Sequence, residues 1–323
     1  MFKTTSQLIS RTSLGRRFLT IIPPAQAVSQ LAKHDDSLIP LDASWYMPNV
    51  PTSAYHEFMK QRLNSRSVFF DIDNISDKSN PYPHMLPSKE LFEKEVGQLG
   101  ISNESTLLIY DQQGIFSACR AAWMFEIFGH DPAKIQILNT YPAYLQAFSD
   151  ANLAAKFLTM NISADRTLVS KPSPLDPTVY TAKFQKSKVV LFEELVELVK
   201  KDKIGSDYTL IDARSKERFT GEAPEPRPGL SSGHIKGAKN LPFTDLLTEN
   251  KSFLSSLSIN SKVKALDIDG SKPIIVMCGT GVTACVIRSG LQAAGFDGEN
   301  IAVYDGSWTE WAQRAPELIV KDV

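Results

Sequence analysis

The sequence predicts an α/β fold built from two tandem domains, each a parallel sheet with helices on both faces. Short apolar segments alternate with amphipathic segments through both halves of the 323-residue chain, as expected for strands joined by crossover helices. The halves also repeat each other at an offset of about 170 residues, which fits duplicated domains and is too long for a solenoid. An apolar content of 42% is enough to fill a core in each domain.

Three matched pairs of apolar segments carry the repeat, and each segment is expected to be a strand. The pairs are 39–42 with 209–212, 107–110 with 274–277, and 135–138 with 301–304. The polar, proline-containing stretch 151–188 is interpreted as a linker, so the first domain is expected to span 37–150 and the second 189–323. Apolar residues at helical spacing predict that the second domain opens with a helix over 191–201.

Residues 1–36 differ in composition from the rest of the chain. They carry five basic residues and no acidic one before Asp35, and their apolar residues never form a continuous run. This composition is typical of a mitochondrial transit peptide, with a disordered basic leader as the alternative. We therefore expect a mitochondrial protein, and incomplete import would add a cytoplasmic pool.

Charge and cysteine usage argue against several classes of protein. A net charge of −1 gives no electrostatic basis for direct nucleic-acid binding. Three cysteines without a C-x-x-C pair, and five scattered histidines, argue against a disulfide framework and against a metal site. No apolar run is long enough to span a bilayer, so no membrane partner is expected.

The segment SKPIIVMCGTGVTACVIRSG, at 271–290, is the most informative one for chemistry. It predicts a buried strand, a tight turn and a helix that begins near Val282, with Cys278 at the joint. Backbone N–H groups in such a turn, together with the positive end of the helix dipole, stabilise a thiolate or a persulfide. Gly279 and Gly281 allow the backbone to curl around the sulfur. The alternative for Cys278 is a small core residue.

The cysteine position is not duplicated. The matching turn of the first half holds Asp111, so only the second half is expected to carry out thiol chemistry. Cys119 and Cys285 lie in apolar helical stretches and are interpreted as core residues, with Cys285 also kept as a candidate redox partner.

Eight segments of the chain resemble the motifs of one family. They are LDASWYMP (41–48), FFDID (69–73), YPHMLPS (82–88), FSACRAAWMFEIFGH (116–130), ERFTGEAPEPRPG (217–229), SGHIKGAKNLPF (232–243), CGTGVTA (278–284) and VYDGSWTEW (303–311). In this order they resemble the two-domain rhodanese-family sulfurtransferases. Neutral residues after the cysteine resemble the branch that prefers 3-mercaptopyruvate, whereas thiosulfate-preferring members tend to carry basic residues there. The pattern is most similar to fungal members, which are also linked to tRNA thiolation.

The resemblance implies a 3-mercaptopyruvate sulfurtransferase that works in two half-reactions. The thiolate takes sulfur from the donor as a persulfide and releases pyruvate, and an acceptor such as thioredoxin or glutathione then removes the sulfur. Because the persulfide is covalent, no separate cofactor is expected. The catalytic loop implied by the resemblance consists of Cys278, Gly279, Thr280, Gly281, Val282 and Thr283.

The resemblance assigns roles to further residues by position. Arg218 and Arg227 match the family's substrate-binding arginines, and a guanidinium binds a carboxylate bidentately. Asp73 and His84 match the first two members of an Asp–His–Ser arrangement proposed for proton transfer, and Thr280 stands where the serine is frequent. A structural role for His84 in its proline-rich loop is the alternative.

Other functions share parts of this pattern. A phosphatase of the same fold would need an arginine where the chain has Ala284. A thiosulfate sulfurtransferase would use the same cysteine with a dianionic donor. A relay protein for tRNA 2-thiouridine formation would take sulfur from a cysteine desulfurase and pass it to a sulfur-carrier protein, without needing Arg218 or Arg227.

Overall fold

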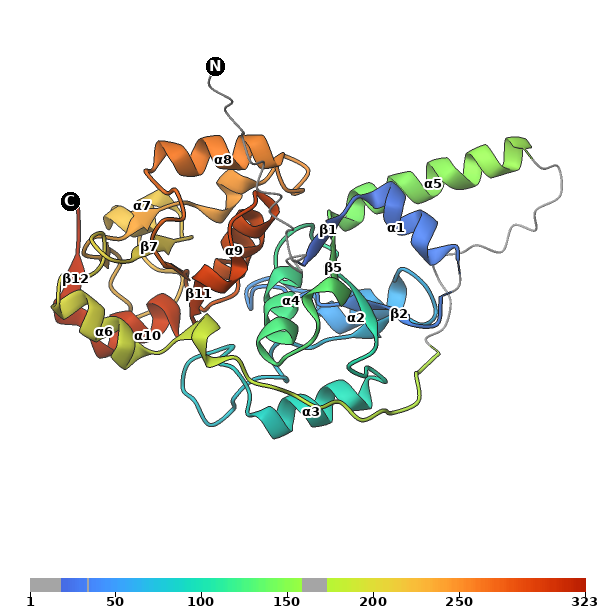
Figure 1. Cartoon of the computed structure of the whole chain (residues 1–323), viewed down its shortest axis with the longest axis horizontal. Coiled ribbons are helices and arrows are strands. Elements are labelled where there is room, and N and C mark those ends of the chain that lie inside the picture. Colours follow the sequence, from blue (N-terminus) through green and yellow to red (C-terminus); the bar gives the residue numbers. More distant parts are fainter. Residues whose placement is uncertain (1–18, 34, 159–172) are drawn as a thin grey trace, which may run out of the picture.

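The computed structural model describes residues 19–33, 35–158 and 173–323, which form two domains side by side (Figure 1). The first domain contains a parallel sheet with the strand order β1 (Thr20–Ile22), β5 (Ile135–Leu138), β4 (Thr106–Tyr110), β2 (Leu38–Asp42) and β3 (Val68–Phe69). The second contains a parallel sheet with the order β6 (Val189–Val190), β11 (Ile301–Tyr304), β10 (Ile274–Met277), β7 (Thr209–Asp212) and β9 (Lys239–Asn240). Strands β8 (His234–Ile235) and β12 (Ile319–Val320) form a separate antiparallel pair. The two parallel sheets match strand for strand, which confirms the predicted duplication.

Helices cover both faces of each sheet (Figure 1). The first domain has α1 (Pro24–Leu31), α2 (Ala54–Lys60), α3 (Lys89–Gln98), α4 (Ala118–Ile127) and α5 (Tyr141–Leu158). The second has α6 (Phe192–Lys200), α7 (Lys216–Thr220), α8 (Ser256–Ala265), α9 (Ala284–Ala293) and α10 (Ser307–Arg314). Short 3-10 helices lie at η1 (Pro132–Lys134), η2 (Lys186–Lys188), η3 (Phe243–Leu246), η4 (Gly298–Asn300) and η5 (Pro316–Leu318). In the described part of the chain, no helix has the length and apolar character needed to cross a membrane.

Strand periodicity assigns each face of a sheet to its own core. Because successive side chains on a strand point to opposite faces, Leu107 and Ile109 of β4 enter a core with α3 and α4, while Leu108 and Tyr110 enter one with α1 and α5. The central strand β10 divides its residues in the same way. All are fully or almost fully buried, which explains why these strands read as continuous apolar runs in the sequence.

The two domains share one apolar core at their interface. Residues of both central strands, β4 and β10, belong to this core. Helices α4 and α9, which are equivalent in the repeat, pack against each other between the sheets (Figure 1). A buried ion pair joins the same helices, since Arg288 of α9 binds both carboxylate oxygens of Glu126 at 2.6 and 2.8 Å. The relative position of the domains is therefore fixed by packing and by charge.

The structure corrects the predicted leader of residues 1–36. Strand β1 pairs in parallel with β5, and helix α1 packs on α5, so residues 20–31 belong to the first domain. They are the counterparts of β6 and α6, which means that the repeat begins earlier than the predicted boundary at residue 37. Basic residues elsewhere in 1–36 led to the prediction of a leader, so this short strand was not predicted. The rest of the predicted transit peptide, residues 1–18, lies outside the described residues.

The predicted linker, 151–188, also differs from the structure. Helix α5 continues through Leu158, and the described residues from 173 onward pack along the first domain. Tyr180 is buried and stacks on His130 with ring centroids 6.0 Å apart, and the Thr178 N–H donates to the Gly97 carbonyl. A side chain at Gly97 would clash with Thr178, because its Cβ would lie 2.6 Å from the Thr178 carbonyl oxygen. This connection is therefore part of the fold.

Replacing Ile22 by Ala tests the corrected boundary. Ile22 is 1% exposed in β1, so the truncation should lower the free energy of unfolding by about 2–4 kcal/mol. Urea unfolding measures the change, and Gln26→Ala on the exposed face of α1 is the control. An Ile22→Ala protein as stable as the control would contradict the placement of β1 in the folded domain.

Candidate active site

Donors from other segments bind the carbonyl groups of the loop after β10. The Trp308 N–H donates to the Cys278 carbonyl at 2.9 Å, and Thr309 donates to the Gly279 carbonyl through its N–H and its hydroxyl, at 3.0 and 2.8 Å. The Cys285 thiol donates to the Gly281 carbonyl at 3.3 Å. The segment after β11 and helix α9 thus bind three carbonyls of the loop.

This arrangement leaves a group of N–H donors available. In a trans peptide the C=O and N–H point in opposite directions, so the N–H groups of Gly279, Thr280 and Val282 point away from the donors that hold the carbonyls. Among the described residues, no acceptor is present for the backbone N–H groups of residues 279–283. Helix α9 begins just after them, at Ala284, slightly later than predicted, and adds the positive end of its dipole. The loop is an anion cradle beside Cys278, which is 2% exposed.

The equivalent loop of the first domain contains a buried carboxyl group. Asp111 follows β4, and its Oδ2 accepts the N–H groups of Phe116 and Ala118, both at 3.0 Å. Burial raises the pKa of Asp111 to about 7. Its Oδ1 has no hydrogen-bond partner among the described residues. A carboxylate at the end of the central strand therefore fills, in this domain, the position that a charged sulfur would occupy in the other.

The structure brings Asp73, His84 and Thr280 together across the domain interface. His84 Nε2 lies 3.0 Å from Asp73 Oδ1, and His84 Nδ1 lies 3.0 Å from Thr280 Oγ1. Trp45 donates its indole N–H to Asp73 at 2.9 Å and stands edge-on to the imidazole. A carboxylate on Nε2 assigns the ring proton to that nitrogen, so Nδ1 accepts from the threonine hydroxyl in the neutral form. The hydrogen bond from His84 lowers the pKa of Asp73.

The two predicted arginines differ in how they are paired. Arg218 donates to Glu225 through Nε at 3.2 Å and through Nη2 at 2.5 Å. Glu225 also accepts from the buried Arg214 at 2.7 Å, and Arg214 in turn pairs with Asp212. Arg227 has no ion-pair or hydrogen-bond partner among the described residues. Burial lowers the pKa of Arg227, while the nearby charge of Cys278 raises it.

Several supporting residues were missed by the sequence analysis. Ser307 accepts the Cys278 N–H at 3.1 Å although its own backbone is left-handed, with φ of 50°. Thr309 binds the loop, Glu225 binds Arg218, and Trp45 binds Asp73. The segments VYDGSWTEW, PEPR and LDASWYMP that contain these residues were recognised as motifs, but no spacing rule connects them to Cys278. Their roles depend on contacts between loops that are distant in the sequence.

The other two cysteines are buried, as predicted for core residues. Both are fully buried, and burial raises the pKa of Cys285 to about 12 and that of Cys119 well above its usual value. Neither thiol is therefore a nucleophile at neutral pH. In the described part of the chain, no cluster of three His, Cys, Asp or Glu side chains is arranged to hold a metal ion.

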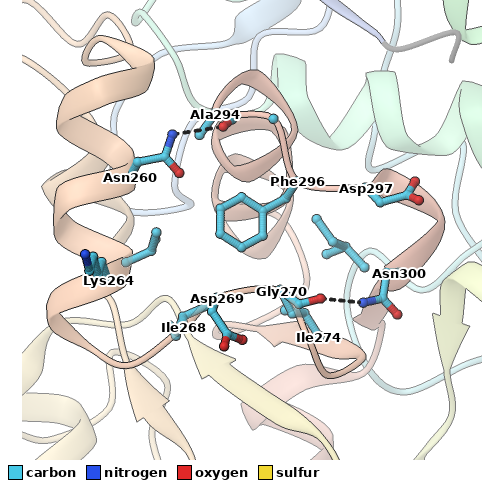
Figure 2. A pocket seen from close by; sticks show the side chains of 13 residues that line it. Asn260, Lys264, Ile268, Asp269, Gly270, Ile274, Ala294, Phe296, Asp297 and Asn300 are labelled. Atoms are coloured by element: carbon cyan, nitrogen blue, oxygen red, sulfur yellow. Dashed lines mark hydrogen bonds between the residues drawn. The ribbon is translucent and has the colours of Figure 1, made fainter. Parts of the chain in front are cut away.

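A surface cavity of about 520 Å³ lies apart from this site, between α8, the end of α9 and the start of β10 (Figure 2). Ile274, the first residue of β10, lines it, whereas Cys278 follows the last residue of that strand. The amides of Asn260 and Asn300 already donate to the carbonyls of Ala294 and Gly270 (Figure 2). The cavity therefore lies at the opposite end of β10 from the sulfur loop, the loop of residues 278–283 that contains Cys278.

Two domains of one fold, with a single cysteine in an anion cradle, define a two-domain sulfurtransferase of the rhodanese class. A family model described as a rhodanese-like domain matches residues 191–314. The chain is 38% identical, over 88% of its length and 73% of the relative, to thiosulfate/3-mercaptopyruvate sulfurtransferase 1, mitochondrial, of Arabidopsis thaliana. The chain belongs to this family of thiosulfate and 3-mercaptopyruvate sulfurtransferases, which confirms the predicted fold class and family.

Solved structures agree with this assignment. The crystal structure of the Tum1 protein from Saccharomyces cerevisiae superposes with a TM-score of 0.81 at 35% identity, covering 94% of this chain and 98% of that one. The sulfur transferase subunit of yeast mitochondrial complex I superposes with a TM-score of 0.82 at 39% identity, covering 94% of this chain and all of that one.

Replacing Asp111 by Asn tests the burial of its charge. A carboxyl whose folded pKa is raised stabilises the protein at low pH and loses that contribution as pH rises through the folded pKa near 7. Asparagine stays neutral, so the stability of Asp111→Asn relative to wild type should rise by about 1–3 kcal/mol between pH 5 and pH 8. Urea unfolding at both pH values measures this, with Asp245→Asn on the surface as control. A difference that is independent of pH would show that Asp111 is ionised throughout.

Proposed function

We propose that the chain transfers sulfur from 3-mercaptopyruvate to a thiol acceptor through a persulfide on Cys278, and releases pyruvate. The observation that carries the choice of donor is the pairing of the arginines. Glu225 neutralises Arg218, while Arg227 is half-buried without a partner among the described residues. Of the two predicted arginines, Arg227 is therefore the one available to the single carboxylate of 3-mercaptopyruvate. It matches the two charges of thiosulfate less well, because the loop adds no basic residue after the cysteine.

In the first half-reaction, the Cys278 thiolate attacks the sulfur of the donor. The new S–S bond forms as the donor's C–S bond breaks, and the bonding pair leaves with pyruvate as its enolate. The carbon of the enolate then takes up a proton. The negative charge on sulfur is stabilised before and after the step by the N–H groups of residues 279–283, which are already oriented and need no reorganisation.

The relay formed by Asp73, His84 and Thr280 supports the proton step. The ionised Asp73 stabilises a positive charge on His84, and protonated His84 donates from Nδ1 to the threonine hydroxyl. That hydroxyl can then donate its own proton to the departing enolate. The β-branched side chain of Thr280 restricts its χ1 rotamer, so the hydroxyl stays aligned with the ring.

In the second half-reaction, a thiolate attacks the outer sulfur of the persulfide and regenerates Cys278. Thioredoxin and glutathione supply thiols of the required chemistry, and the persulfide replaces any separate cofactor. The mechanism predicts ping-pong kinetics, because pyruvate leaves before the acceptor reacts. Thiosulfate is the alternative donor, and the names of relatives include both donors.

A relay role in tRNA thiolation is the second candidate. A cysteine desulfurase would load Cys278 directly, and a sulfur-carrier protein would unload it, so the same persulfide would serve both functions. The relative named thiosulfate sulfurtransferase TUM1, 35% identical to this chain, supports the fungal resemblance on which this candidate rests. The two candidates differ in their need for Arg218 and Arg227.

We infer a mitochondrial location, with a cytoplasmic pool where import is incomplete. The basic composition of residues 1–18 supports it. So do the mitochondrial designation of the Arabidopsis relative and the description of a solved yeast relative as a subunit of mitochondrial complex I.

The nucleophile is tested by Cys278→Ser. Pyruvate release from 3-mercaptopyruvate should fall at least about 1,000-fold, because the alcohol is a far weaker nucleophile than the thiolate. Mass spectrometry after donor treatment should find a persulfide on wild type and none on the variant, and Cys119→Ala is the control. Thiosulfate with cyanide is run in parallel. Faster turnover of thiosulfate would overturn the choice of donor, and activity retained by Cys278→Ser would overturn the nucleophile.

The anchoring role of Arg227 is tested by Arg227→Met. Loss of the Arg227 guanidinium should raise KM for 3-mercaptopyruvate about 10- to 100-fold, and Arg218→Met should raise it less because Glu225 already binds that group. Arg66→Met, on the surface of the first domain, is the control. Persulfide loading by a cysteine desulfurase should be unchanged in Arg227→Met. An equal loss in both assays would show that Arg227 supports the structure of the loop and does not bind the carboxylate of the donor.

A further inference from the structure

A buried arginine from the first domain reaches into the loops of the active site. Arg120, on α4, is 0% exposed. Its guanidinium donates to the His84 carbonyl, donates to the Gly281 carbonyl at 3.4 Å, and lies 2.8 Å from Asp305 Oδ1 as an ion pair. One side chain therefore contacts the histidine loop of the first domain and the sulfur loop of the second.

The partner of this arginine makes the reverse connection. Asp305 follows β11 in the second domain, and its Oδ2 accepts the N–H of Leu86, two residues after His84, at 2.8 Å. The segment around His84 is thus held on its carbonyl side by Arg120 and on its N–H side by Asp305. This matters because His84 has a left-handed backbone, with φ of 64°, which a residue other than glycine adopts only where its surroundings impose it.

The sulfur loop is packed closely against the same pair. A Cβ atom on Gly281 would lie 2.8 Å from an Arg120 nitrogen and 2.8 Å from the Asp305 carbonyl oxygen. The φ of 78° at Gly281 also favours glycine. By binding the Gly281 carbonyl, Arg120 orients the Gly281–Val282 peptide and directs the Val282 N–H the opposite way, as required for the anion cradle.

We propose that Arg120 and Asp305 are positioning residues that hold the His84 loop in register with the Cys278 loop across the domain interface. Neither is assigned contact with the substrate. Their effect is on the 3.0 Å contact between His84 and Thr280 and on the direction of the loop N–H groups. This inference rests on the proposed function for its effect on turnover, and it concerns residues that the mechanism does not use directly.

The structure supplies a matched control for this proposal. Glu126 and Arg288 form a second buried ion pair between α4 and α9, and neither touches the loops of His84 or Cys278. Arg120 and Glu126 lie on the same helix, both almost fully buried. A purely structural role would make the two pairs equivalent, whereas a positioning role would separate them.

The experiment compares Arg120→Met/Asp305→Asn with Arg288→Met/Glu126→Gln. Both charges of a pair are removed together, so that no unpaired charge is left buried, and Lys188 keeps Glu299 as a partner in the control. Thermal unfolding reports stability. Pyruvate release from 3-mercaptopyruvate gives kcat and KM across pH, and alkylation of Cys278 by iodoacetamide across pH reports the thiolate without any donor.

The first double variant should lose about 10- to 100-fold in kcat with a smaller change in KM, and the pH profile of Cys278 alkylation should shift. The control, Arg288→Met/Glu126→Gln, should keep the wild-type kcat and alkylation profile, even where its melting temperature falls as much as that of the first variant. Arg120→Lys should restore part of kcat, because an ammonium supplies the charge without the two-carbonyl fork. Equal effects in the two double variants, or an unshifted alkylation profile in the first, would overturn the proposal. Failure of wild type to release pyruvate would refute the proposed donor, while the alkylation profiles would still decide the positioning role.

Discussion

The shared apolar core between the sheets, with α4 packed against α9, is the constraint on which the site depends. Cys278 and Thr280 come from the second domain, whereas His84 and Asp73 come from the first, so the relay exists only while the domains are docked. Apolar packing alone is tolerant of small sliding, but buried ion pairs are not, since a displaced charge would be left unpaired in a low dielectric. The pairs Arg120–Asp305 and Glu126–Arg288 thus give the interface a single register.

Duplication produced two loops of the same kind with different chemistry. In each, a buried strand ends at a tight turn that presents N–H groups, and a helix follows. In the first domain the side chain of Asp111 accepts hydrogen bonds from two such N–H groups. In the second, the N–H groups beside Cys278 remain available to the negative charge that the sulfur carries during the proposed reaction. The fold creates the electrostatic environment, and one residue at the strand end decides whether it is structural or catalytic.

The arrangement of arginines shows how a neutral protein can present a selective cationic site. Glu225 lies between Arg214 and Arg218 and offsets part of their positive charge. Arg227, in contrast, is half-buried without an ion-pair partner in the described part of the chain, and burial lowers its pKa. Under the proposed function, the pairing of arginines within the protein, and not their number in the sequence, sets the positive charge available to the donor.

The sequence by itself determined the duplication, the central strands and the sulfur loop, because each depends on local features. Apolar runs such as 274–277 favour buried strands, and glycines beside a cysteine at a strand end indicate a tight turn, although Trp308, Thr309 and Arg120 then orient its peptides. It did not determine that residues 20–31 belong to the first domain, because the three-residue strand β1 is too short to show periodicity. Nor did it reveal Arg120, Asp305, Ser307 or Glu225, although their motifs were recognised. Asp73 and His84 were identified only by resemblance, and only the folded interface decided that His84 meets Thr280. Contacts between residues almost 200 positions apart depend on how the two domains pack, so they leave no pattern along the chain.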